Sequence, residues 1–98
     1  MTIKIRQARK QVFEELGFAA EEAANLRLRS ELMTALLQLI ERRGLSQAGA
    51  AALLGVSQPR ISDLARGKID RFSVDTLIAM LGHAGAEVRV SVRNPRVA

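Results

Sequence analysis

The order of apolar and polar positions divides the chain into helical segments followed by one segment of alternating pattern. Residues 19–43 carry apolar side chains at three- and four-residue steps, which predicts a long amphipathic helix, either continuous or kinked between residues 25 and 30. Gly44 ends it. The predicted apolar stripe, which we assign to the core, consists of Leu28, Leu32, Ala35, Leu36, Leu39 and Ile40.

Residues 45–68 predict two short helices that meet at a tight turn. Ser46 and Ser57 precede the two helices and can cap their free N–H groups. Gly55 lies where the first helix must stop, because glycine reaches the left-handed backbone region without a Cβ clash. Pro59 falls in the first turn of the second helix, where its missing N–H costs nothing. The apolar side of this corner consists of Ala51, Leu54, Val56, Ile61 and Leu64, and Gly67 ends the second helix.

A last helix is predicted after Phe72, with Ser73 as its cap and Gly82 and Gly85 around its end. We expect four of its side chains to face inward: Val74, Leu77, Ile78 and Leu81. His83, the only histidine, is expected at the surface near the end of this helix.

Residues 86–93 change period, because Val88, Val90 and Val92 alternate with polar residues, which predicts a half-buried β-strand. A single strand needs a partner for its backbone groups. That partner is either residues 2–6 of the same chain or the same strand of a second subunit. We favour pairing between subunits, which would give an antiparallel, two-fold dimer and cover an exposed strand edge.

Residues 1–11 carry Lys4, Arg6, Arg9 and Lys10 and no acid. We slightly favour a frayed basic tail over a short strand, an arm on the DNA backbone, or a segment ordered by a protein partner. In the following amphipathic turn, three apolar residues are expected to pack on the main domain or to form a partner site: Phe13, Leu16 and Phe18.

Composition restricts the class of protein. A chain of 98 residues with 48% hydrophobic content suits one small domain. The absence of cysteine excludes disulfides and thiolate metal sites, and a single histidine cannot form a metal centre. No apolar run could span a membrane and none suits a signal peptide, so we expect a cytoplasmic protein. We expect no cofactor, and no residues are arranged for nucleophilic or acid–base catalysis, so we expect no enzyme.

The net charge of +5 favours a polyanionic partner. Aromatic residues make up only 3% of the chain, and this argues against single-strand binding by base stacking. A corner that presents a polar helix is instead suited to reading the major groove of double-stranded DNA.

The corner resembles the Cro/phage-repressor-type (XRE) helix-turn-helix family over residues 45–68, and the wider domain does so over about residues 30–82. The matching positions are Ser46, Gln47, Ala51, Gly55, Val56, Ser57, Gln58, Ile61, Gly67 and Lys68. The resemblance implies an all-α, lambda-repressor-like bundle of about five helices, here with a short C-terminal strand. We divide the chain into an N-terminal extension (1–29), the DNA-binding domain (30–82) and a C-terminal strand and tail (83–98).

Two positions depart from the family pattern. Ala65 replaces a glutamate that usually pairs with an arginine, and the arginine position is Ile40 here, so we expect an apolar contact in place of an ion pair. Pro59 replaces a polar base-reading side chain, although proline can contact a thymine methyl group.

The resemblance assigns DNA roles to the corner. Gln58 can bind an adenine edge bidentately and Arg60 can take guanine or a phosphate. The full set of base-reading candidates is Ser57, Gln58, Pro59, Arg60, Ser62 and Asp63. Phosphate candidates are Gln47, Arg66, Lys68 and Arg71. Two such helices related by a two-fold axis would read both halves of an inverted repeat.

We therefore expect a sequence-specific, homodimeric transcriptional repressor. The leader, the recognition-helix sequence and the valine-alternating tail also resemble HigA-like antitoxins, which bind their own operator and neutralise a RelE/HigB-like ribonuclease toxin. The alternatives are a stand-alone phage-type repressor and a protein-binding module that has lost DNA reading.

Overall fold

The computed structural model of the protein describes residues 2–4 and 19–93, and its described part is mostly helical, as predicted. The elements in chain order are β1 (Thr2–Lys4), α2 (Ala20–Arg42), α3 (Gln47–Leu54), α4 (Gln58–Ala65), the 3₁₀-helix η1 (Ile69–Arg71), α5 (Val74–His83) and β2 (Arg89–Ser91). At residues 2–4 the chain forms a strand, which corrects our slight preference for a frayed basic tail there. The rest of that basic segment and the Phe13–Phe18 turn lie outside the described residues.

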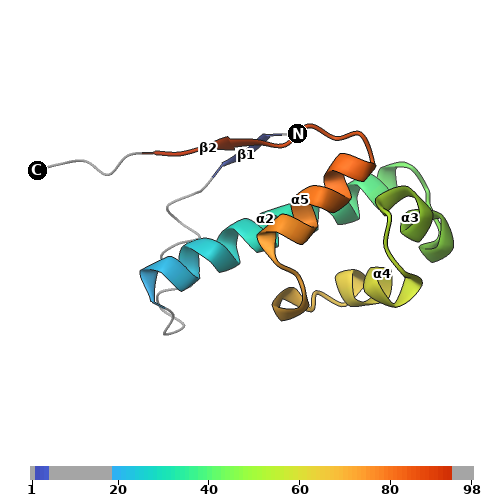
Figure 1. Ribbon diagram of the computed structural model, residues 1–98, viewed down its shortest axis with the longest axis horizontal. Coiled ribbons are helices and arrows are strands. Elements are labelled where there is room, and N and C mark those ends of the chain that lie inside the picture. Colours follow the sequence, from blue (N-terminus) through green and yellow to red (C-terminus); the bar gives the residue numbers. More distant parts are fainter. Residues whose placement is uncertain (1, 5–18, 94–98) are drawn as a thin grey trace, which may run out of the picture.

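The first predicted helix is a single continuous element. α2 runs unbroken for 23 residues, which confirms the continuous alternative. Glu21 and Glu22 lie in its first turn and Arg42 in its last, which complements the helix dipole. α5 lies alongside α2, whereas α3 and α4 lie together at one end (Figure 1). The boundary that we placed after residue 29 falls within α2.

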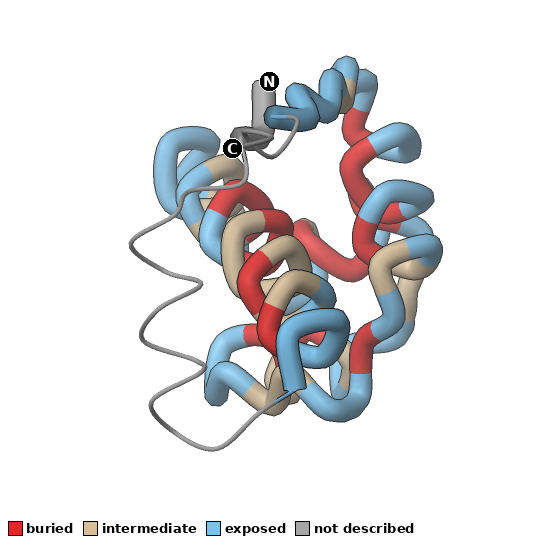
Figure 2. Tube along the Cα trace, turned by 90° about the vertical axis from the view of Figure 1, so that its left-hand side faces the viewer, coloured by how far each residue is buried: buried red, intermediate tan, exposed pale blue. Residues whose placement is uncertain are grey.

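The core lies where the inward faces of α2, α3, α4 and α5 meet (Figure 2). Phe72, between η1 and α5, contributes a fully buried ring to it. The largest buried side chains besides this ring are Leu32, Leu36, Leu54, Leu64, Leu77, Met80 and Leu81. The predicted stripe of α2 therefore faces the core, with Leu28, Leu39 and Ile40 partly buried at its margin.

One inward assignment in α5 was wrong. Ile78 is exposed, and Met80 takes a core position instead. Leu77 and Leu81 are four residues apart and define the buried face. Ile78 is rotated by about 100° from Leu77 and so falls outside the contact with α2, whereas Met80 lies on the other margin of the same face.

The two strands pair within the chain, and this corrects our preference for pairing of β2 between subunits. β1 and β2 run parallel with Thr2 opposite Arg89, Ile3 opposite Val90 and Lys4 opposite Ser91 (Figure 1). The strand is also shorter and more exposed than expected. Val88 precedes it and packs on the core, whereas Val90 and Val92 are 51% and 73% exposed. No described element covers the face that these two valines occupy. The alternating pattern of valine and polar residues therefore predicted the strand but not its burial.

Candidate nucleic-acid interface

The corner between α3 and α4 is capped as the sequence predicted. The Ser46 hydroxyl accepts a hydrogen bond of 3.0 Å from the Gly49 N–H, and the Ser57 hydroxyl accepts one of 3.4 Å from the Arg60 N–H. Gly55 ends α3 with φ of +69°, in the left-handed region. The Ser57 cap sets the start of α4 at Gln58, and the first residues of this helix are exposed.

The turn is covered from α5 by the only histidine. The His83 ring lies against Gly55, where a Cβ would come within 3.1 Å of three ring atoms. His83 is exposed at the end of α5, as predicted, but its ring has this local contact. Gly55 is thus required both for its backbone conformation and for the space that the ring occupies.

The most accessible part of the candidate site is the first turn of α4. Ser57, Gln58 and Pro59 are all exposed, and Gln47 is exposed at the start of the neighbouring α3. Ser62, one turn after Gln58, is half-buried. Gln47 and the first residues of α4 thus lie at the N-termini of two helices that pack against each other.

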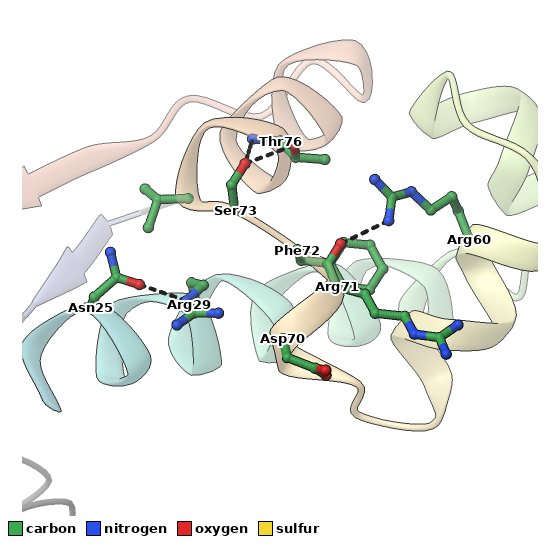
Figure 3. Close-up of a pocket in the computed structure, with 9 residues that line it drawn as sticks. Asn25, Arg29, Arg60, Asp70, Arg71, Phe72, Ser73 and Thr76 are labelled. Carbon is green, nitrogen blue, oxygen red and sulfur yellow. Dashed lines mark hydrogen bonds between the residues drawn. The ribbon is translucent and has the colours of Figure 1, made fainter. Parts of the chain in front are cut away.

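Arg60 does not extend outward with these residues. Its Nη1 donates a hydrogen bond of 2.7 Å to the carbonyl of Arg71, and its Cζ lies 5.0 Å from the centre of the Phe72 ring. Figure 3 shows the side chain reaching from α4 toward the connection between η1 and α5. Arg60 precedes Leu64 by four residues and so flanks the buried side of α4. The four-residue spacing of Arg60 and Leu64 can be seen in the sequence. The sequence does not show that Arg71 and Phe72 are the partners of Arg60.

Asp63 is likewise held within the protein. Its carboxylate lies 3.3 Å from Nη1 of Arg71 and 3.7 Å from Nζ of Lys68, and its side chain is only 17% exposed. Two of the four phosphate candidates, Lys68 and Arg71, are thereby paired to this acid. Arg66 is exposed, and no ion-pair partner is present for it among the described residues.

A pocket of about 410 Å³ lies beside this network. Arginines from three elements line it: Arg29 of α2, Arg60 of α4 and Arg71 of η1 (Figure 3). The other lining residues are Asn25, Asp70, Phe72, Ser73, Val74 and Thr76.

Arg29 was not predicted as a site residue. It donates to the side chain of Asn25 at 2.6 Å and to the carbonyl of Ile69 at 3.0 Å, which links α2 to η1. The periodicity of α2 identifies the core side chains, but it gives no signal for this polar contact with a residue 40 positions later.

The two departures from the family pattern have separate outcomes. Ile40 packs against the core, whereas Ala65 is exposed at the end of α4. The contacts that tie the flank of α4 to the following segment come from Arg60 and Asp63 instead. Pro59 occupies the first turn of α4, as expected.

Residues 2–4 and 19–93 contain no cluster of three or more histidine, cysteine or acidic side chains suitable for a metal. No helix in that part of the chain is both long and apolar enough to cross a bilayer.

Comparison with known proteins agrees with this geometry. No curated protein matches the chain. A solved structure, named as an XRE family transcriptional regulator, is 36% identical, with a TM-score of 0.71 over 79% of this chain and 90% of its own. A family described as "Helix-turn-helix domain" matches residues 12–93, which include α2 through β2. The chain therefore belongs to the XRE-type helix-turn-helix family.

Proposed function

We propose that this protein is a sequence-specific, double-stranded-DNA-binding transcriptional repressor. The observation that carries the proposal is the exposed, serine-capped first turn of α4, which begins at Gln58, together with the exposed Gln47 at the start of α3. An α-helix with an exposed first turn fits the major groove, and a glutamine there can bind an adenine edge. The net charge of +5 supports association with a polyanion.

The direct test is selection of duplexes from a random double-stranded library, followed by binding measurements over a range of salt concentrations. We expect enrichment of an inverted repeat, because two copies of α4 related by a two-fold axis would read two half-sites. We also expect affinity to fall steeply with salt, as phosphate contacts release counterions. Failure to enrich any sequence would favour a protein-binding module that has lost DNA reading.

The narrower part of the proposal is that the repressor is the antitoxin of a toxin–antitoxin pair and acts as a homodimer. The support for the antitoxin role is the resemblance of the leader, the recognition-helix sequence and the valine-alternating tail to HigA-like antitoxins. Separately, Ala23 and Arg27 in the first half of α2 are buried outside the core cluster. Arg27 is 3% exposed, and its Nε and Nη1 form no hydrogen bond with a described residue.

Affinity capture of the tagged protein from its native host, with analysis of both protein and DNA, tests the antitoxin role. Recovery of a small ribonuclease together with the protein's own promoter would support an autoregulating antitoxin. Recovery of the promoter without a protein partner would instead identify a stand-alone repressor.

A further inference from the structure

Arg60 belongs to α4, the candidate recognition helix, but its guanidinium contacts Phe72 and Arg71 of the following segment. It could therefore either read a base or hold α4 in place. The Phe72 ring beneath it is 1% exposed and fixed in the core. The Arg71 carbonyl accepts its Nη1–H at 2.7 Å. A face contact with an aromatic ring and an in-plane hydrogen bond together fix both the position and the tilt of the guanidinium.

Arg71 binds two side chains of α4. Arg71 gives its carbonyl to Arg60 and its guanidinium to Asp63, so two side chains of α4 are joined to one residue of the following segment. Arg60 and Asp63 are three residues apart and therefore adjacent on the helix surface. α4 has only eight residues and two fully buried side chains, Ile61 and Leu64. A helix this short derives its orientation from its contacts, because it has little stability of its own.

Guanine recognition by arginine uses two parallel N–H groups of the guanidinium directed at O6 and N7. In the structure, Nη1 of Arg60 is bound to the Arg71 carbonyl and the guanidinium lies over Phe72, directed toward the connection between η1 and α5 and not outward with the first turn of α4 (Figure 3). We therefore infer that Arg60 is a positioning residue, which sets the orientation of α4 in the groove and reads no base itself. The inference rests on the proposed DNA-binding function and leaves direct reading to the exposed first turn and Ser62.

The first test observes Arg60 in the free protein by NMR of arginine side chains. A guanidinium over the face of a ring is shifted upfield by the ring current, so we expect upfield signals for Arg60 and ordinary ones for the exposed Arg66. Phe72→Leu should remove the shift while keeping an apolar side chain in the core. Ordinary Arg60 signals in the wild-type protein would overturn the inference.

The second test adds a duplex obtained by selection. A positioning residue keeps its upfield signals in the complex, whereas a base-reading residue would lose them as it moves into the groove. Arg60→Gln should lower affinity for the selected duplex by roughly tenfold, a loss comparable to one charged hydrogen bond. Arg60→Lys, which keeps a cation over the ring, should recover part of that loss.

The effect of Arg60→Gln at each base pair of the selected duplex distinguishes a positioning role from direct base reading. When each base pair of the selected duplex is changed in turn, we expect the effect of Arg60→Gln to spread over all positions that α4 reads. Loss concentrated at one G·C pair would show direct reading and overturn the inference. If selection enriches no duplex, the proposed function fails and with it the DNA role of Arg60. The free-protein spectrum then still decides whether Arg60 holds α4.

Discussion

At the scale of single residues, side chains that look equivalent on α4 have different surroundings. Gln58 is exposed at the tip of the helix, Arg60 is attached to Phe72 and Arg71, and Arg66 is exposed beyond the last turn. This difference predicts distinct binding phenotypes, because base contacts carry sequence information and phosphate contacts do not.

Gln58→Ala should relax specificity at one A·T position by about 1–3 kcal/mol. Arg66→Ala should instead weaken binding to all duplexes alike and lower the salt slope by about 1. Electrophoretic or fluorescence binding assays on the selected duplex and on its single-base variants measure both effects. Equal loss for Gln58→Ala on every duplex would contradict a base-reading role.

Gly55→Ala should destabilise the fold by more than Gly67→Ala. Both residues have positive φ, +69° and +70°, so both substitutions carry the cost of about 1–2 kcal/mol for a left-handed backbone. Only at Gly55 would the new Cβ meet the His83 ring, whereas no atom lies within 4 Å of a Cβ at Gly67. Urea unfolding measures the difference, and adding His83→Ala to Gly55→Ala should remove the excess. An excess that persists in the double variant would rule out the ring as its cause.

At the scale of elements, the helix starts depend on serine caps that tie each helix to the residue before it. Ser46, Ser57 and Ser73 each accept a hydrogen bond from the backbone N–H three residues later. All three were predicted as caps, because the signal lies within four consecutive residues.

Ser73→Ala should lower the free energy of unfolding by about 1 kcal/mol, since it leaves the Thr76 N–H without its cap. Ser73→Asp should retain most of the stability, because a carboxylate can also accept this bond and suits the helix N-terminus. Thermal and urea unfolding compare the two variants with the wild type. Equal losses in both would show that the cap contributes little.

At the scale of the whole molecule, the C-terminal strand is the segment for which our predicted pairing partner was wrong. β2 pairs with β1 of its own chain, yet Val90 and Val92 remain exposed and β2 is one edge of a two-stranded sheet. Two strands alone are marginal, so further cover by a second subunit remains our proposal for the dimer.

Val90→Lys combined with Val92→Lys should convert the proposed dimer to a monomer, because charge on an apolar face opposes burial between subunits. Ser91→Lys, on the alternate side of the same strand, is the matched control and should leave the mass unchanged. Sedimentation velocity measures the mass of each. A wild-type protein that is already monomeric, or a dimer that survives both valine substitutions, would contradict the role of this face.

Prediction from sequence succeeded where the signal is local. The length of α2, the caps of three helices, the left-handed Gly55 and the buried Ile61 and Leu64 follow from periodicity and from residues within one turn of each other. It failed at Ile78, because the limit of a buried face depends on how widely α2 covers α5. It also failed to find Arg29, whose partner is a backbone carbonyl 40 residues away.

The sequence by itself determined the helix-turn-helix corner, its turn and the apolar faces that form the core. These depend on backbone preferences and on the 3.6-residue period, which act over a few neighbouring positions. Only the tertiary structure decided the partner of β2, the attachment of Arg60 to Phe72 and Arg71, and the pairing of Asp63 with Arg71 and Lys68. Each of these contacts joins residues that lie more than one helical turn apart in the sequence. A strand edge or a charged side chain takes whichever partner the folded chain brings within reach, and residues within one turn of it carry no signal for that partner.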